Sequence, residues 1–214
     1  HKNVKMNIDL IRQDTRGCSD KLFFNSAGAS LMPQTVVKAM AEHLQLEEQL
    51  GGYEAARRKS ETADRLYQEI ARLINCKPSN IAFTNNATDA YARALSSIPL
   101  ERGDCIITTS DDYVSNQIAF ISLQKRLKIE VIRIKNLPDN DLDLEDLVSL
   151  IKKHHPKLVA VTHIPTNSGL IQNVAGVGKI CRQYDVLYLV DACQSIGQLP
   201  VDVNEIGCDF LTAA

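Results

Sequence analysis

Short apolar runs alternate with amphipathic segments along most of the chain. The apolar runs predict strands at residues 81–84, 105–109, 129–134, 158–164, 186–190 and 210–213. The segments between them carry apolar residues at helical spacing and predict helices at residues 87–98, 116–127, 144–154 and 174–184. This alternation predicts an α/β fold, a three-layer αβα arrangement with a mostly parallel sheet.

Two further helices are expected before the first strand. Pro33 opens one that runs to Leu50 and is closed by Gly51-Gly52, and a second spans residues 58–75. Apolar residues of the second recur at helical spacing, so we expect this stripe to face the core: Ala63, Leu66, Ile70, Leu73 and Ile74. Residues 1–5 precede Met6 and resemble added or leader sequence.

The composition excludes several classes of protein. With 214 residues, 44% hydrophobic and 23% charged, the chain matches a globular protein with one substantial core. Its net charge of −2 argues against a nucleic acid partner, because there is no basic stripe to displace phosphate counterions. No apolar run approaches the roughly 20 residues of a membrane span, and residues 1–10 lack the apolar core of a signal peptide. We therefore expect a cytoplasmic protein that binds neither nucleic acid nor membrane.

The six cysteines are widely spaced and form no CxxC pair, which favours free thiols in a reducing compartment. We predict no metal site. Cys193 lies near Asp191, but buried cysteines are common, which favours a small core residue over a nucleophile.

The strand expected at residues 186–190 ends on a carboxylate, Asp191, and Gln194 follows three residues later. Parallel sheets bind ligands at the carboxyl ends of their strands. A charge carried there by a buried strand needs a cationic partner, or its pKa must rise. Asp191 and Gln194 are therefore candidate ligand-binding residues.

Polar residues also follow the other predicted strands. Asn86, Ala87 and Thr88 open a helix after residues 81–84, where free N–H groups suit a phosphate, although a plain N-cap is the alternative. Tyr113 could lie flat on a planar ligand or be an exposed turn residue, and Thr166 with Asn167 could donate hydrogen bonds.

An earlier loop of small residues, 25–29, lets backbone approach a ligand closely, and an ordinary turn is the alternative. We assign Asn25, Gly28 and Ala29 to substrate binding. Together, the loops after the strands supply an anion cradle, an aromatic plate, a neutral donor and a buried carboxylate. A planar, phosphorylated ligand with a basic ring nitrogen would use all four, and pyridoxal 5′-phosphate has this chemistry.

Five segments resemble the class V aminotransferase and cysteine desulfurase-like family of fold type I pyridoxal phosphate enzymes: TNNATDAY, DDYVSN, HIPTNSG, LVDACQSIGQLPVDV and DFLTAA. The resemblance extends from Phe24 to the end of the chain, and Asp-x-x-Gln followed by Pro-Val-Asp-Val is its most specific part. GGYEA at residues 51–55 and HIPTNSG resemble the isopenicillin N epimerase-like branch more than the cysteine desulfurases.

The resemblance implies a role for each candidate around the cofactor. Asp191 would keep the pyridinium nitrogen protonated, which preserves the ring as an electron sink. Gln194 would bond the phenolic oxygen, and Thr88 with the Asn86 and Ala87 backbone would hold the phosphate. The aromatic plate would be Tyr113, with Val114 the adjacent alternative.

Thr166 falls where desulfurases have an asparagine near the phenolic oxygen, and Asn167 is the alternative for that contact. The family's Schiff-base lysine follows a segment like DFLTAA, so we expect it about three residues beyond Ala214. The resemblance thus implies a truncated chain, inactive as given: an N-terminal segment, 1–30, and a cofactor-binding large domain, 31–214, without its remaining strand or the small domain.

The implied parent protein acts on an amino acid by transamination, epimerisation or lyase chemistry through a quinonoid, and is a homodimer. Cysteine desulfurase or selenocysteine lyase activity is the alternative within enzymes. A non-catalytic binding module is the alternative outside them.

Overall fold

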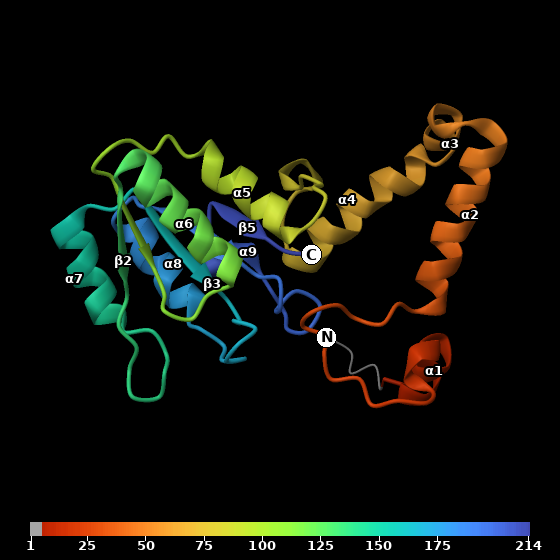
Figure 1. The fold of residues 1–214 in the computed structure, drawn as a ribbon, viewed down its shortest axis with the longest axis horizontal. Coiled ribbons are helices and arrows are strands. Elements are labelled where there is room, and N and C mark those ends of the chain that lie inside the picture. Colours follow the sequence, from red (N-terminus) through yellow and green to blue (C-terminus); the bar gives the residue numbers. More distant parts are fainter. Residues whose placement is uncertain (1–5) are drawn as a thin grey trace. The chain divides into compact units, whose positions relative to one another are not determined.

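The computed structural model of the chain describes residues 6–214 and divides it into two compact units (Figure 1). The first unit extends to Leu66, and the second comprises Tyr67–Ala214. The candidate cofactor-binding residues all lie in the second unit, whereas the 25–29 loop lies in the first. The expected division at residue 30 stays a prediction.

The first unit is helical. Its elements are α1 (Ile8–Asp14), a short 3-10 helix η1 (Arg16–Cys18), α2 (Gln34–Leu50), α3 (Gly52–Arg58) and the start of α4 (Ser60–Ile74). Pro33 and Gly51 bound α2 as predicted, and Gly51 adopts a φ of 80° that other residues rarely take. The next helix, α3, follows at once from Gly52, because the Gly51 carbonyl accepts a hydrogen bond from Ala55 N.

The predicted core-facing stripe of α4 was only partly correct. Ile74 is buried, but Leu66 is 42% and Leu73 is 55% exposed. Helical spacing identifies an apolar face without revealing whether another element covers it.

The second unit is built on a five-stranded parallel sheet, which confirms the predicted fold class. Its strands are β1 (Cys105–Thr108), β2 (Glu130–Arg133), β3 (Leu158–Thr162), β4 (Leu187–Asp191) and β5 (Phe210–Thr212). Their order across the sheet is β2-β1-β3-β4-β5, and all four pairs are parallel. The chain therefore moves outward from β1 to β2 and returns to the other side of β1, so a switch point lies between β1 and β3.

Helices cover both faces of this sheet (Figure 1). The second-unit helices are the end of α4, α5 (Ala87–Ser97), α6 (Val114–Leu127), α7 (Leu144–His154), α8 (Val174–Gln183) and the short α9 (Val203–Ile206), with a 3-10 turn η2 (Pro78–Asn80). Successive strand residues face opposite sides. Thus Ile106 and Leu189 pack with α5 and α6, whereas Ile107 and Val190 pack with α7, α8, α9 and the end of α4.

The helix boundaries agree closely with the sequence pattern. The Asp143 side chain caps α7 by accepting from Glu145 N and Asp146 N, as the predicted N-cap requires. The largest differences are at two starts: α6 begins at Val114 rather than at residue 116, and α4 begins at Ser60 rather than at residue 58.

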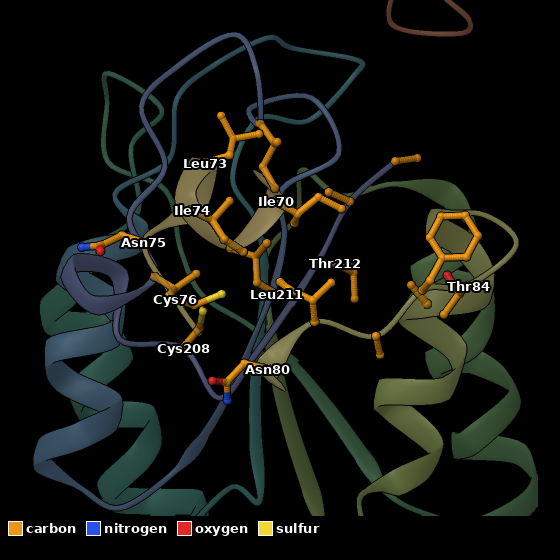
Figure 2. Close-up of a pocket in the computed structure, with 18 of the residues that line it drawn as sticks. Ile70, Leu73, Ile74, Asn75, Cys76, Asn80, Thr84, Cys208, Leu211 and Thr212 are labelled. Carbon is orange, nitrogen blue, oxygen red and sulfur yellow. The ribbon is translucent and has the colours of Figure 1, made fainter. Parts of the chain in front are cut away.

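The strand expected at residues 81–84 was wrong: within residues 6–214, this segment forms no ladder. A pocket of about 1010 Å³ is lined by residues 80–86 on one side and by Leu211 and Thr212 of β5 on the other (Figure 2). A strand needs a neighbour to pair its N–H and C=O groups. The segment is apolar, but the pocket separates it from the nearest sheet edge.

The contact between α8 and α9 yields a stability prediction. A Cβ on Gly178 would overlap the carbonyl oxygen of Ile206, a backbone atom that cannot turn aside. We expect Gly178→Ala to lower the free energy of unfolding by about 1–3 kcal/mol or more, measured by urea denaturation. The control is Gly52→Ala in α3, where the nearest atom is 4.0 Å from the added Cβ and stability should be unchanged or slightly higher. Equal stability of the two variants would contradict this packing.

Candidate functional site

Buried polar residues end three neighbouring strands of the sheet. Thr162 on β3, Asp191 on β4 and Thr212 on β5 stand in register with one another, and each is at most 6% exposed. The Thr212 hydroxyl has no hydrogen-bond partner among the described residues. The strand ends therefore form a compact polar row at the edge where parallel sheets bind ligands.

Asp191 is the charged member of this row. Its Oδ1 accepts from Cys193 N at 3.0 Å, and its Oδ2 accepts from Asn116 Nδ2 at 3.0 Å. Burial raises the pKa of Asp191, the Asn116 and Cys193 hydrogen bonds lower it, and the nearby Asp112 charge raises it. Within residues 6–214, no cationic side chain forms an ion pair with it. The carboxylate thus sits in surroundings that favour a proton or an external cation.

Sequence reasoning missed the partner carboxylate Asp112. Its Oδ1 accepts from Thr162 Oγ1 at 2.5 Å and from Tyr113 N at 2.7 Å, and its Oδ2 accepts from Gln117 Nε2 at 2.6 Å. The available signal was the spacing of Asp112 and Asn116, since residues four apart meet at the start of a helix. The pairing with Thr162 of β3 had no signal in the sequence.

The loops at the β1/β3 switch point are joined by direct contacts. Asn167 Nδ2 lies 3.3 Å from Asp111 Oδ1, and Gln172 Nε2 donates to the Asp111 carbonyl at 3.1 Å. The loop after β1 therefore bonds both to the end of β3 and to the loop that follows it. Asn167, the alternative to Thr166 for the contact with the phenolic oxygen, hydrogen-bonds Asp111 between these two loops.

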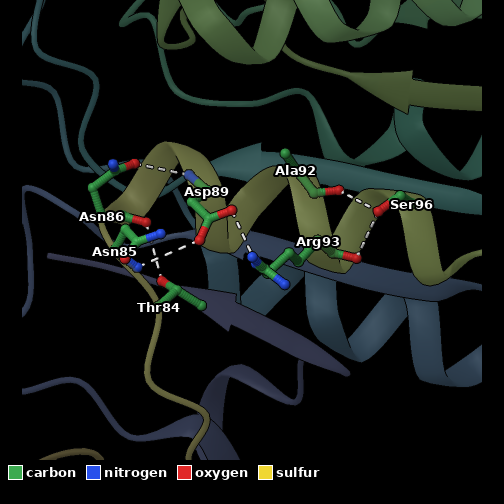
Figure 3. Close-up of polar contacts among 7 residues, drawn as sticks. All are labelled: Thr84, Asn85, Asn86, Asp89, Ala92, Arg93 and Ser96. Atoms are coloured by element: carbon green, nitrogen blue, oxygen red, sulfur yellow. Dashed lines mark hydrogen bonds and ion pairs between the residues drawn. The ribbon is translucent and has the colours of Figure 1, made fainter.

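The N-terminus of α5 carries the predicted phosphate cradle (Figure 3). Asn86 is the N-cap, and its side chain accepts from Asp89 N at 2.9 Å. Asp89 in turn accepts from Asn85 N at 3.4 Å and pairs with Arg93 at 2.9 Å, which lowers the pKa of Asp89. The plain N-cap alternative is therefore correct for the Asn86 side chain. It leaves the N–H groups of Ala87 and Thr88 at the first helical turn, the position at which helices bind anions.

The remaining candidates lie on the loops that follow β1, β3 and β4. Tyr113 stands at the N-cap position of α6 and is 42% exposed, whereas Val114 is 63% exposed. Thr166 is exposed and Gln194 is half-buried. Their roles stay predictions.

Asn25, Gly28 and Ala29 form a turn in the first unit. The Asn25 carbonyl accepts from Gly28 N at 3.1 Å and from Ala29 N at 3.2 Å. An ordinary turn, the alternative considered for this loop, describes its backbone, and its assignment to substrate binding stays a prediction.

Two side chains near the site lack the features of activated catalysts. Burial, together with the Asp191 charge, raises the pKa of Cys193, which disfavours a reactive thiolate. His163 is buried, which lowers its pKa and favours the neutral ring. Its Nδ1 has no hydrogen-bond partner among the described residues. All six cysteines are free.

Residues 6–214 contain no cluster of three or more His, Cys, Asp or Glu side chains able to hold a metal ion. In the same part of the chain, no helix combines the length and apolar character needed to cross a membrane.

The parallel sheet, its switch point and the polar strand ends define an α/β protein with polar side chains at the carboxyl edge, where such sheets bind ligands. Residues 22–214 match the family model described as aminotransferase class-V, and the chain belongs to this family.

Similar proteins include a probable cysteine desulfurase of Pyrococcus abyssi, 32% identical, which aligns with 94% of this chain and 51% of its own length. The apo cysteine desulfurase of Thermococcus onnurineus NA1 is 28% identical with a TM-score of 0.86, over 96% of this chain and 52% of that one. A C-DES mutant with glycine covalently linked to its PLP cofactor shares the fold, with a TM-score of 0.86 at 22% identity, over 95% and 55% of the two chains. This chain spans about half the length of these relatives.

The raised pKa of Asp191 predicts a specific pH dependence of stability. The folded chain holds the Asp191 proton to a higher pH than the unfolded chain does, so stability falls as pH rises through the interval between the two pKa values. We expect the free energy of unfolding of wild type, relative to Asp191→Asn, to decline as pH rises from about 4. Each pKa unit that separates the folded from the unfolded value of Asp191 contributes about 1.4 kcal/mol to this decline. Urea unfolding without ligand at a series of pH values measures this difference.

Asp89→Asn serves as a control with the opposite sign. Because Arg93 lowers the pKa of Asp89, stability of wild type relative to this variant should rise with pH across the carboxyl range. The same slope for both variants would contradict the environment of Asp191 described above.

Proposed function

We propose that this chain provides the cofactor-binding part of a pyridoxal 5′-phosphate enzyme that acts on an amino acid. The observation that carries the proposal is the buried Asp191 carboxylate, which ends β4 and has no cationic side-chain partner among residues 6–214. A pyridine ring nitrogen that carries a proton supplies such a cation. Membership of the aminotransferase class-V family supports the same cofactor.

The donors at the site fit the cofactor's functional groups. The first turn of α5 presents the N–H groups of Ala87 and Thr88, and we propose that these bind the phosphate together with the Thr88 hydroxyl. Asn86 shapes this turn as its N-cap. Asp89 lies in the same turn, and its pairing with Arg93 at 2.9 Å offsets the charge that would repel a phosphate.

The other roles follow from positions on the neighbouring loops. We propose that Asp191 accepts a hydrogen bond from the ring nitrogen and keeps it protonated, and that Gln194 and Thr166 hydrogen-bond the phenolic oxygen. Tyr113, partly exposed beside Asp112, would stack on the ring face. When bound, the cofactor supplies an electron sink for the electron pair of a bond broken at the substrate α carbon.

Three reactions on an amino acid are candidates for the whole protein. The similarity to cysteine desulfurases supports carbon–sulfur lyase chemistry on cysteine. The GGYEA and HIPTNSG segments favour an isopenicillin N epimerase-like reaction instead. Transamination shares the same first steps, so the substrate class common to all three is an amino acid.

The whole protein's properties extend the proposal. Because the chain spans about half of its relatives, we propose that catalysis requires residues outside these 214, including the Schiff-base lysine. A cytoplasmic homodimer is the assembly we propose for the whole protein.

Binding of 4′-deoxypyridoxine 5′-phosphate tests the proposed function. This analogue has the ring nitrogen, phenolic oxygen and phosphate but no aldehyde, so its binding requires no lysine. We expect Asp191→Asn to weaken binding about 10–100-fold, as the loss of a charge-assisted hydrogen bond implies. Thr88→Val should weaken it about 2–10-fold. Isothermal titration calorimetry measures both.

The control is Asp139→Asn, an exposed carboxylate in the turn between β2 and α7, which should bind the analogue as wild type does. Wild type that fails to bind, or an Asp191→Asn variant that binds equally well, would favour the non-catalytic module instead.

A further inference from the structure

A single side-chain amide lies between two carboxylates at the carboxyl edge of the sheet. Asn116 Nδ2 donates to Asp191 Oδ2 at 3.0 Å and to Asp112 Oδ1 at 2.9 Å. A carboxylate only accepts, so the nitrogen end of the amide must lie between the two acids. A primary amide has two N–H groups, and here each serves one carboxylate.

Asp112 is itself held in place by several donors. It accepts from the backbone of Tyr113, from the hydroxyl of Thr162 and from the amide of Gln117, in addition to Asn116. These donors come from the loop after β1, from the end of β3 and from α6. Movement of the Asp112 carboxylate would break contacts with all three.

Asp191 depends on this arrangement for one of its two oxygens. Cys193 N, a backbone donor, holds Oδ1, and the side-chain amide of Asn116 holds Oδ2. Asn116 is 2% and Asp191 is 6% exposed, so water has little access to replace a lost contact. An Asn116 amide freed from Asp112 could rotate away and release the Asp191 carboxylate.

We propose that Asp112 is a positioning residue for the cofactor site: acting through Asn116, it fixes the orientation of the Asp191 carboxylate that receives the ring nitrogen. The inference rests on the proposed function, because it concerns the same carboxylate. It adds a role for two residues, Asp112 and Asn116, to which the proposed function assigns none.

The charge of Asp112 has a second effect at the same place. The titratable groups around Asp191 are Asp112 from the loop after β1, Tyr91 from α5 and Cys193 from its own loop. Of these, Asp112 acts on Asp191 through its charge, which raises the pKa of Asp191. A second negative charge near the ring nitrogen favours its protonated form, so removal of this charge should make the bound ring easier to deprotonate.

The test uses 4′-deoxypyridoxine 5′-phosphate labelled with ¹⁵N in the ring, bound to the 214-residue chain. Calorimetry gives the affinity, and the ¹⁵N chemical shift across pH gives the pKa of the bound ring nitrogen. Asp112→Ala and Asn116→Ala should each weaken binding about tenfold. The double variant should also lose about tenfold rather than about a hundredfold, because both changes remove one arrangement.

The Asp112→Asn variant separates the positioning role of Asp112 from the effect of its charge. Its amide oxygen can still accept from Asn116 and Thr162, so affinity should stay within about threefold of wild type. The pKa of the bound ring nitrogen should nevertheless fall by about one unit. If Asp112→Ala fails to fold by circular dichroism, Asp112→Asn and Asn116→Ala carry the test.

The matched control is Asp111→Asn, the adjacent acid, which contacts Asn167 instead of Asn116 and should change affinity less than about twofold. The inference alone would be overturned if the losses of affinity added in the double variant. The same conclusion would follow if Asp112→Ala still caused a tenfold loss of affinity in an Asp191→Ala background. Wild type that does not bind the analogue would overturn the proposed function and this inference together.

Discussion

A carboxylate buried at the end of a parallel strand is the constraint on which this site depends. Asp191 is removed from water by the strands on either side of it, and burial is the largest cause of its raised pKa. Two N–H donors hold its oxygens without supplying a positive charge. A buried charge in such surroundings is costly unless a proton neutralises it or a cation pairs with it. A protonated pyridine nitrogen is a cation and also donates a hydrogen bond.

The topology of the sheet explains how distant segments reach this carboxylate. Because the chain leaves β1 toward β2 and returns to form β3 on the other side, β1 and β3 are neighbours at the switch point. The loops that follow them are joined there by hydrogen bonds from Asn167 and Gln172 to Asp111. Asp112 then bonds Thr162, which lies directly beside Asp191 in the β3/β4 register. Packed helices on both faces make the strand ends rigid, so the polar groups are held at fixed positions.

Sequence reasoning succeeded where one residue type has few possible uses. An acid that directly follows five apolar residues has few structural explanations, so Asp191 could be identified before its surroundings were known. It failed for segments whose structure depends on another element that pairs with them or packs on them. Among residues 6–214, the apolar run at 81–84 has no strand to pair with. Leu66 and Leu73 of α4 are exposed, because helical spacing gives an apolar face but not an element that covers it.

The sequence by itself determined the alternation of helices and strands from α5 to β4, the ends of α2 and α7, and the acid at the end of β4, because these depend on local periodicity, capping and turn residues. Only the tertiary structure decided which loops meet. Asn116 lies between Asp112 and Asp191 although Asp191 is 75 residues away along the chain. Parallel strand pairing brings such residues together, and no local pattern records a contact made over that separation.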